Sequence, residues 1–148
     1  MEFFDRLLQQ HRYILDLTKT LGTEADAESR KKTLDRLESE FELHCFLHES
    51  CIYPVLERFE SAENRSAVLW ENHNALRGTI QSLREGLERD VPWGIRVGAI
   101  IEALETHFED EQTHVLADLR RVASEEALLE LEGRLEYAEQ QQRSKRAA

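Results

Sequence analysis

The chain has 148 residues, enough for one domain with a sizeable core, and its 41% hydrophobic and 33% charged residues exclude disorder. A formal net charge of −11 argues against a nucleic-acid-binding protein. No apolar stretch approaches the ~20 residues of a membrane span, and the amino terminus lacks a signal-peptide pattern. Cys45 and Cys51 lie on one predicted helix in poor geometry for a disulfide, so we expect free thiols in the core and a cytoplasmic location.

Hydrophobic residues recur three and four positions apart in four long segments, which is the pattern of helices that each bury one face. The first segment covers residues 4–21, and Asp26 is a suitable cap for the helix that follows. The second covers residues 34–59. Pro54 lies inside it and is expected to kink or end the helix locally.

The third and fourth segments cover residues 66–87 and 97–122. Ser61 is expected to cap the third helix, and Pro92 suits the first turn of the fourth. Alternation of the kind seen in strands is absent from the sequence. We therefore predict an all-α protein, with an up-down-up-down four-helix bundle in residues 1–122.

A weaker fifth segment covers about residues 124–141 and carries Leu128, Leu131 and Leu135. We expect residues 123–148 to form an additional short C-terminal helix on the outside of the bundle, with a frayed tail from Gln140. The three leucines could serve a homodimer contact.

The sequence also repeats itself. The same number of residues separates His44 from His107 and His48 from Glu111, and nearly the same number separates His11 from His73. Each half therefore has a helix with one histidine, followed by a helix with a pair of polar residues at positions i and i+4. This arrangement predicts one site shared by two half-bundles.

All six histidines lie on or beside the predicted inward faces. A buried imidazole needs a partner, because an unsatisfied buried polar group costs about 1–3 kcal/mol. At a rise of about 1.5 Å per residue, the positions counted from the turns fit one layer. We expect that layer to be a metal site with the ligands His11, His44, His48, His73, His107 and Glu111. Glu49 and His114 are expected to contact these ligands or to bind metal themselves.

Five imidazoles and one carboxylate exceed the four ligands of a closed zinc site. They fit two iron ions better, with Glu111 bridging and oxo or hydroxo ligands completing the coordination. A single iron or a zinc ion remains an alternative, as does a metal-free bundle. Trp70, Tyr53 and Phe108 are expected to wall the site.

The order and spacing of these residues resemble the hemerythrin-like, or HHE, cation-binding domain over roughly residues 1–122. The matching residues are His11, His44-Cys45-Phe46-Leu47-His48-Glu49, Ile52-Tyr53-Pro54, His73, and His107 with Glu111. The resemblance implies a four-helix bundle with a non-haem di-iron centre that binds O2 or responds to oxygen, NO or peroxide.

The chain differs from the usual pattern of that family at two positions. His48 stands where the family commonly has Glu, with Glu49 beside it. Animal hemerythrins have a second histidine four residues after the one that matches His73, and here that residue is Arg77. Glu49 lies about 100° around the helix from His48, so it would bridge only if the helix were distorted near Pro54.

We therefore expect a protein that binds or senses O2 or a related small oxidant, with no nucleic-acid or membrane partner and no catalytic residue of its own. The alternatives are a di-iron oxidase or peroxidase, an NO-handling protein, an iron-donating repair protein, or a structural site with one iron or zinc. Oxygen turnover separates the enzymes from a carrier, and metal content separates the structural site from both.

Overall fold

The structure is a computed structural model that describes residues 2–58, 65–87 and 92–147. Every element assigned in these ranges is a helix, so the all-α prediction is confirmed. Helix α1 (Glu2–Thr23) leads to α2 (Ala27–Phe46), which Asp26 caps by accepting a hydrogen bond of 2.8 Å from the Ser29 N–H, as predicted. Helix α4 (Arg65–Ser82) continues into a 3-10 turn, η3 (Leu83–Gly86).

Helix α5 (Trp93–Asp110) begins immediately after Pro92, which is its N-cap residue. Pro92 was expected in the first turn of this helix and lies one position before it. Ser61 and residues 90–91 of the predicted turn lie outside the described residues.

Two of the long helices contain a wide π-helical turn. The first is η1 (Leu47–Ile52), between α2 and α3 (Tyr53–Leu56), and the second is η4 (Glu111–Leu116), between α5 and α6 (Ala117–Val122). In η1 the Tyr53 N–H donates to the carbonyl of His48, five residues earlier. Pro54 has no N–H, and it lies in the first turn of α3, where none is needed. Such turns are uncommon and are frequent at functional sites.

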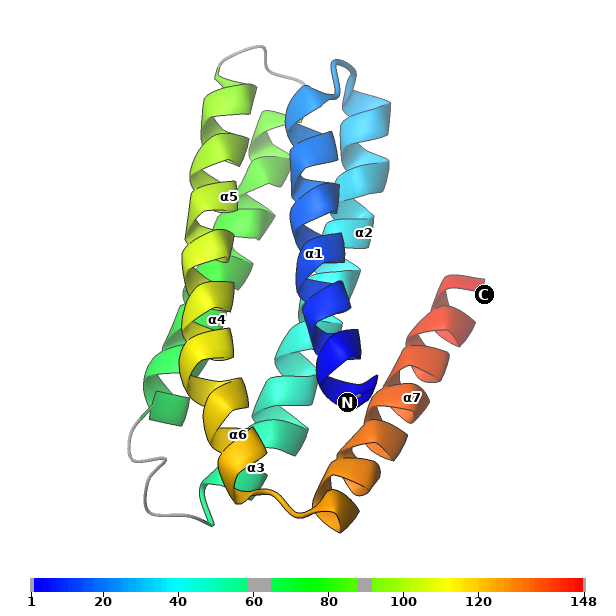
Figure 1. Ribbon diagram of the computed structural model, residues 1–148. Coiled ribbons are helices and arrows are strands. Elements are labelled where there is room, and N and C mark those ends of the chain that lie inside the picture. The colour runs from blue at the N-terminus through cyan, green and yellow to red at the C-terminus, as the bar shows by residue number, and fades with distance from the viewer. Residues whose placement is uncertain (1, 59–64, 88–91, 148) are drawn as a thin grey trace.

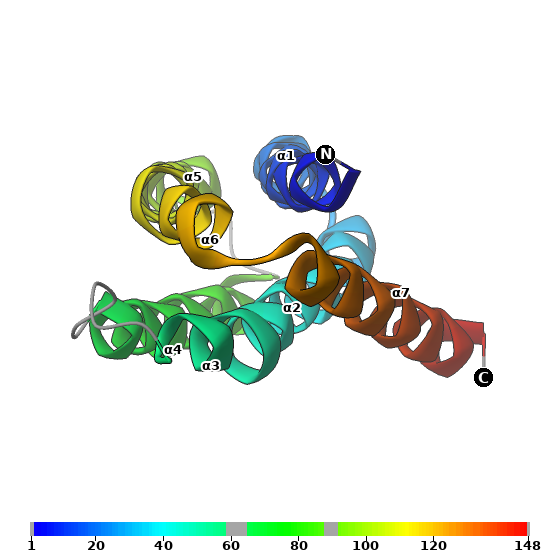
Figure 2. The same ribbon diagram turned by 60° about the horizontal axis from the view of Figure 1, so that its bottom comes forward.

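The four helices of the bundle, α1, α2, α4 and α5, lie lengthwise beside one another (Figure 1). Contacts join α1 to α2, α2 to α4, α4 to α5, and α5 to α1, so the four helices enclose a common interior, which Figure 2 shows from one end. Within the described residues, none of these helices is long and apolar enough to cross a membrane.

A layer of polar side chains divides the apolar interior into two clusters. Along α1, Leu7 belongs to one cluster and Ile14 to the other, and the buried His11 lies between them. Along the continuous helix formed by α5 and η4, Leu104 and Val115 belong to opposite clusters. The polar layer is thus surrounded by hydrophobic packing above and below, which excludes water from it.

Helix α7 (Glu125–Ala147) has 23 residues, so the prediction of a short C-terminal helix is wrong. It lies obliquely across the bundle and contacts η1, α1 and α2 (Figure 2). Leu128, Leu131 and Leu135 are buried against the bundle of the same chain, at 6%, 3% and 1% exposure. These leucines therefore do not form the free edge that a homodimer contact would need.

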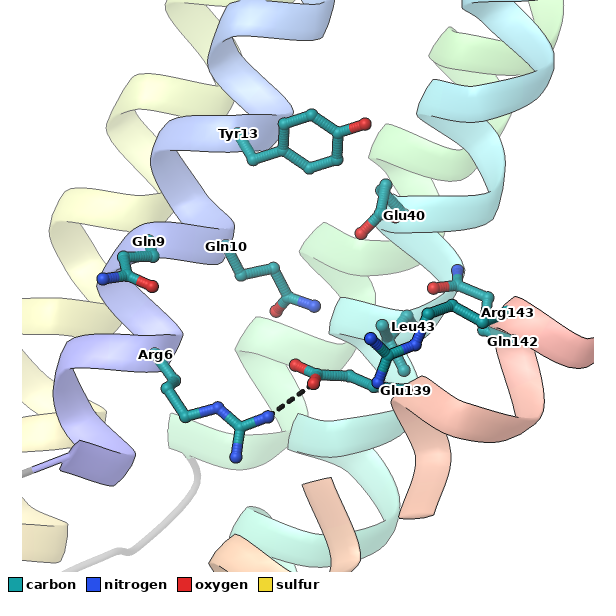
Figure 3. Close-up of a pocket in the computed structure, with 9 residues that line it drawn as sticks. All are labelled: Arg6, Gln9, Gln10, Tyr13, Glu40, Leu43, Glu139, Gln142 and Arg143. Carbon is teal, nitrogen blue, oxygen red and sulfur yellow. Dashed lines mark hydrogen bonds and ion pairs between the residues drawn. The ribbon is translucent and has the colours of Figure 1, made fainter. Parts of the chain in front are cut away.

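The segment expected to fray from Gln140 is helical to Ala147, because polar contacts hold it to the bundle. The Gln142 amide donates to the carbonyl and hydroxyl oxygens of Ser39. Arg6 forms ion pairs with Glu136 and Glu139. A polar pocket of about 340 Å³ remains between α1, α2 and α7 (Figure 3).

Candidate metal centre

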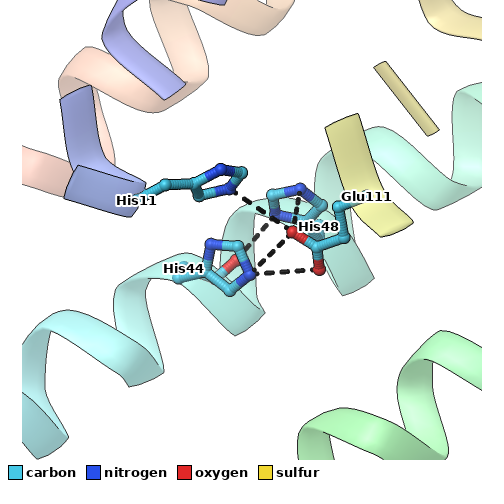
Figure 4. A group of neighbouring side chains, drawn as sticks. All are labelled: His11, His44, His48 and Glu111. Carbon is cyan, nitrogen blue, oxygen red and sulfur yellow. Dashed lines mark hydrogen bonds and ion pairs between the residues drawn. The ribbon is translucent and has the colours of Figure 1, made fainter. Parts of the chain in front are cut away.

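The carboxylate of Glu111 is the centre of the polar layer. Glu111 is completely buried at the start of η4, and five histidines direct their Nε2 atoms toward it. Figure 4 shows three of these histidines around the carboxylate. The distances to Oε2 are 3.4 Å from His11, 3.0 Å from His44 and 3.2 Å from His48, and those to Oε1 are 2.8 Å from His73 and 2.5 Å from His107.

The histidines form two groups that share Glu111. His11, His44 and His48 lie at Oε2, and His73 and His107 lie at Oε1. The His44 Nε2 is also 3.1 Å from Oε1. Its ring centroid lies nearest that of His48, at 4.2 Å, and is 5.2 Å from that of His11, 5.3 Å from that of His73 and 5.8 Å from that of His107, so His44 is within reach of both groups. Each group could hold one metal ion.

In two of the histidines, the hydrogen bond made by Nδ1 determines whether Nε2, the atom that faces Glu111, carries a proton or a lone pair. The His48 Nδ1 lies 3.0 Å from the carbonyl oxygen of His44, which can only accept, so Nδ1 carries the proton. The His73 Nδ1 lies 3.1 Å from a carboxylate oxygen of Glu49 and donates in the same way. With the proton on Nδ1, the Nε2 atom of a neutral imidazole presents a lone pair to Glu111.

Lone pairs that face carboxylate oxygens at 2.8–3.2 Å repel one another unless a cation lies between them. The Nε2 atoms of His11, His48 and His107 and the Oε2 atom of Glu111 are also buried without a hydrogen-bond partner. Buried polar atoms normally have partners, and metal ions would satisfy all of these together. The residues present therefore fit a metal centre.

The protonation states agree with this chemistry. Burial lowers the pKa of His44 well below its usual range and that of His48 to about 4, so both imidazoles are neutral near pH 7. Burial by itself would raise the pKa of Glu111, but the histidines around it, His44 and His48 first, together lower it well below its usual range. Neutral imidazoles with an ionised carboxylate are the ligand forms that transition metals bind.

Glu49 lies outside the two groups around Glu111. It is buried, and its carboxylate accepts hydrogen bonds from the His73 Nδ1 at 3.1 Å and from an Arg77 nitrogen at 2.9 Å. Arg77 also donates to Glu42 at 2.8 Å. The helix is distorted next to Pro54, as a bridging role would require, but the Glu49 side chain is directed toward His73 instead. It fixes the ring orientation of His73 from behind.

Cys45 is a further buried neighbour of His73 and Glu49. Burial raises the pKa of its thiol, so the group is protonated at neutral pH and is a poor metal ligand in that form. Both Cys45 and Cys51 are buried free cysteines, as the sequence predicts.

Three aromatic rings stack on the histidines. Phe108 lies on His11 with ring centroids 4.2 Å apart, and Tyr53 lies on His73 at 6.0 Å. The third ring, Phe41, stacks on His44 at 5.7 Å; it was not predicted, although it lies three residues before that histidine on the same inward face. The prediction for Trp70 is wrong, because its side chain is 44% exposed.

The structure does not bring His114 to the layer. Its side chain is exposed, whereas those of Val115 and Leu116 are buried. In a regular α-helix, residues three and four positions after Glu111 share its face. The π-helical turn η4 has more residues per turn, so the inward positions move to the fourth and fifth residues and His114 faces solvent.

Comparison with known proteins agrees with the chemistry of the layer. A family model described as the Hemerythrin HHE cation binding domain matches residues 2–119, which include Glu111 and all five histidines around its carboxylate. A search of curated proteins gave no match. Because the family model spans most of the sequence, the chain belongs to the hemerythrin HHE cation-binding family.

Proposed function

We propose that this protein holds a non-haem di-iron centre in an up-down-up-down four-helix bundle and binds O2 or a related small oxidant, such as NO or peroxide, there. The observation that carries the proposal is the sharing of one buried carboxylate by two groups of histidines, which also have His44 in common. Five imidazoles and a carboxylate are more ligands than a closed zinc site uses. Imidazole with carboxylate is a donor set that suits iron.

In this proposal, His11, His44 and His48 hold one iron, and His73 and His107 hold the other. Glu111 contributes one oxygen to each, since Oε2 faces the first group and Oε1 faces the second. Iron bound in this way supplies electron transfer to small oxidants. Burial keeps the imidazoles of His44 and His48 neutral, and the stacked aromatic rings exclude water. The Nδ1 contacts of His48 and His73 orient those two rings.

Glu49 contributes to the charge balance of the proposed metal centre. A single carboxylate at the metals offsets little of the charge of two iron ions. Glu49 provides a second buried negative charge one ring away, through its hydrogen bond to His73. Arg77 holds Glu49 in the orientation that makes this contact. We also propose a cytoplasmic location, because both cysteines are free thiols.

The test is metal content by elemental analysis on protein expressed in iron-supplied cells, with visible spectra under air and under argon. We expect about two irons per chain and absorption bands that change with O2. His107→Ala should lower the iron content, and His114→Ala is the matched control because that histidine is exposed. Zinc, or no metal with a featureless spectrum, would contradict the proposal.

A further inference from the structure

His11 differs from His48 and His73 in the partner of its outer nitrogen. The Nδ1 atoms of His48 and His73 face a carbonyl and a carboxylate, which can only accept, so each Nδ1 carries a proton. The His11 Nδ1 instead lies 3.0 Å from the amide nitrogen of Gln112, which can only donate. A neutral His11 that accepts this hydrogen bond carries its proton on Nε2, the atom that faces Glu111.

The ring of His11 is held in place, which leaves the position of its proton as the main variable. Phe108 stacks on the ring with the centroids 4.2 Å apart and the planes 9° from parallel, and His11 is 1% exposed. Its Nε2 is 3.4 Å from Oε2 of Glu111, which is longer than the ~2.7–3.2 Å of an N–H···O hydrogen bond. A nitrogen that carries a proton has no lone pair for a metal, so the proton must move to Nδ1 before His11 can bind one.

The amide of Gln112 suits both positions of that proton. It has a donor nitrogen and an acceptor oxygen, and turning the amide over exchanges the two at the His11 Nδ1. Gln112 is an exposed residue, so packing opposes this turn little. The ring stays neutral throughout, because Nε2 gives one proton to water and Nδ1 takes one from water. The carbonyl behind His48 and the carboxylate behind His73 accept in every orientation and hold their protons on Nδ1.

The π-helical turn η4 brings Gln112 to this position. Gln112 directly follows Glu111 in that turn and reaches His11 on α1, 101 residues earlier in the chain. The same turn therefore provides the carboxylate in front of His11 and the amide behind it.

We infer that Gln112 is a positioning residue that sets which nitrogen of His11 carries the proton, and that His11 is the exchangeable ligand of the centre. In metal-free protein the amide nitrogen donates to Nδ1 and the proton lies on Nε2. When the site is loaded, the amide oxygen accepts from Nδ1 and the Nε2 lone pair becomes available. The inference rests on the metal-binding function proposed above, but its first test needs no metal.

That test is NMR of the histidine ring nitrogens in metal-free protein, in weakly alkaline buffer, because their chemical shifts show which nitrogen carries the proton. We expect the His11 proton on Nε2 in the parent protein and on Nδ1 in Gln112→Glu, whose carboxylate can only accept. Thr113→Glu is the control, since it adds the same charge at the next exposed residue of η4 and should keep the parent form. A parent protein with the proton on Nδ1, or a Gln112→Glu spectrum like that of the parent, would overturn the inference.

Iron retention against a competing chelator tests the consequence for binding. Gln112→Glu should hold one iron per chain about tenfold more tightly than the parent, and Gln112→Leu should hold it about tenfold less tightly. The Thr113→Glu control should match the parent. Equal retention in both Gln112 variants would overturn the role of His11 as the exchangeable ligand. A parent protein that never loads two irons would instead refute the di-iron proposal, and the NMR result would still decide the role of Gln112.

Discussion

Glu49 supports only one of the two groups of histidines, so changing it should weaken only one metal. The Glu49 side chain is 8% exposed, and its Oε2 atom accepts the proton of the His73 Nδ1 at 3.1 Å. A hydrogen bond to a charged group is worth about 1.5–3 kcal/mol and is roughly twice as strong as a neutral one. Glu49→Gln keeps an acceptor oxygen but loses the charge. We therefore expect the binding free energy of the metal at His73 to fall by about 1.4 kcal/mol, which is a tenfold lower affinity.

Glu49→Leu removes the acceptor and leaves the His73 N–H buried without a partner. That variant should lower the affinity of the same metal by about a hundredfold, at the upper end of what such outer contacts contribute. Glu42→Gln is the matched control, because Glu42 also accepts from Arg77 but makes no contact with His73. The Glu42 side chain is largely exposed, so Glu42→Gln should leave the metal affinity almost unchanged.

The assay is iron retention against a competing chelator, measured as iron per chain at increasing chelator concentration. The parent and Glu42→Gln should lose iron together. In Glu49→Gln and Glu49→Leu, one iron per chain should leave at lower chelator concentration, while the iron held by His11, His44 and His48 stays. If both irons are lost equally in the Glu49 variants, or neither is weakened, Glu49 does not act through His73 and the reasoning is refuted.

Three further predictions concern stability and the limits of the site. The pKa of His48 is about 4 in the folded protein against 6.5 when unfolded, so the unfolded chain binds more protons between these two pH values. The metal-free protein should therefore lose up to about 3 kcal/mol of unfolding free energy as the pH falls from 7 to 4, measured by urea denaturation. His48→Leu should make the stability depend less on pH over this range. Leu131→Ala should cost about 2–5 kcal/mol of unfolding free energy in the same assay, because Leu131 is on α7, is 3% exposed and packs against the bundle. A cost below ~0.5 kcal/mol would mean that α7 does not pack on the bundle. His114→Ala should leave both iron content and stability unchanged, and a loss of iron in this variant would show that the exposed histidine reaches the site after all.

The sequence is sufficient to predict the helices and the layer of histidines, since both follow from periodicity. Apolar residues spaced three and four apart identify the buried face, and His11, His44, His73 and His107 lie on it. The internal repeat indicates that His48 and Glu111 occupy corresponding positions. The structure brings these residues together around one carboxylate.

The misplaced residues are those whose position depends on backbone geometry or on distant packing. The π-helical turns shift the inward face by one residue, and the spacing of residues in the sequence does not predict such turns. His114 was therefore expected to face the interior, but it is exposed. The orientation of Glu49 is determined by Arg77, 28 residues away. The length of α7 depends on contacts such as that between Gln142 and Ser39, which local propensity does not show.

The most direct test of the central claim is anomalous diffraction at the iron absorption edge from crystals of the iron-loaded protein. The account predicts two iron peaks, one beside Oε2 of Glu111 among His11, His44 and His48, and the other beside Oε1 with His73 and His107. A single peak, a peak for zinc instead of iron, or a layer of histidines with no metal in iron-loaded protein would contradict it.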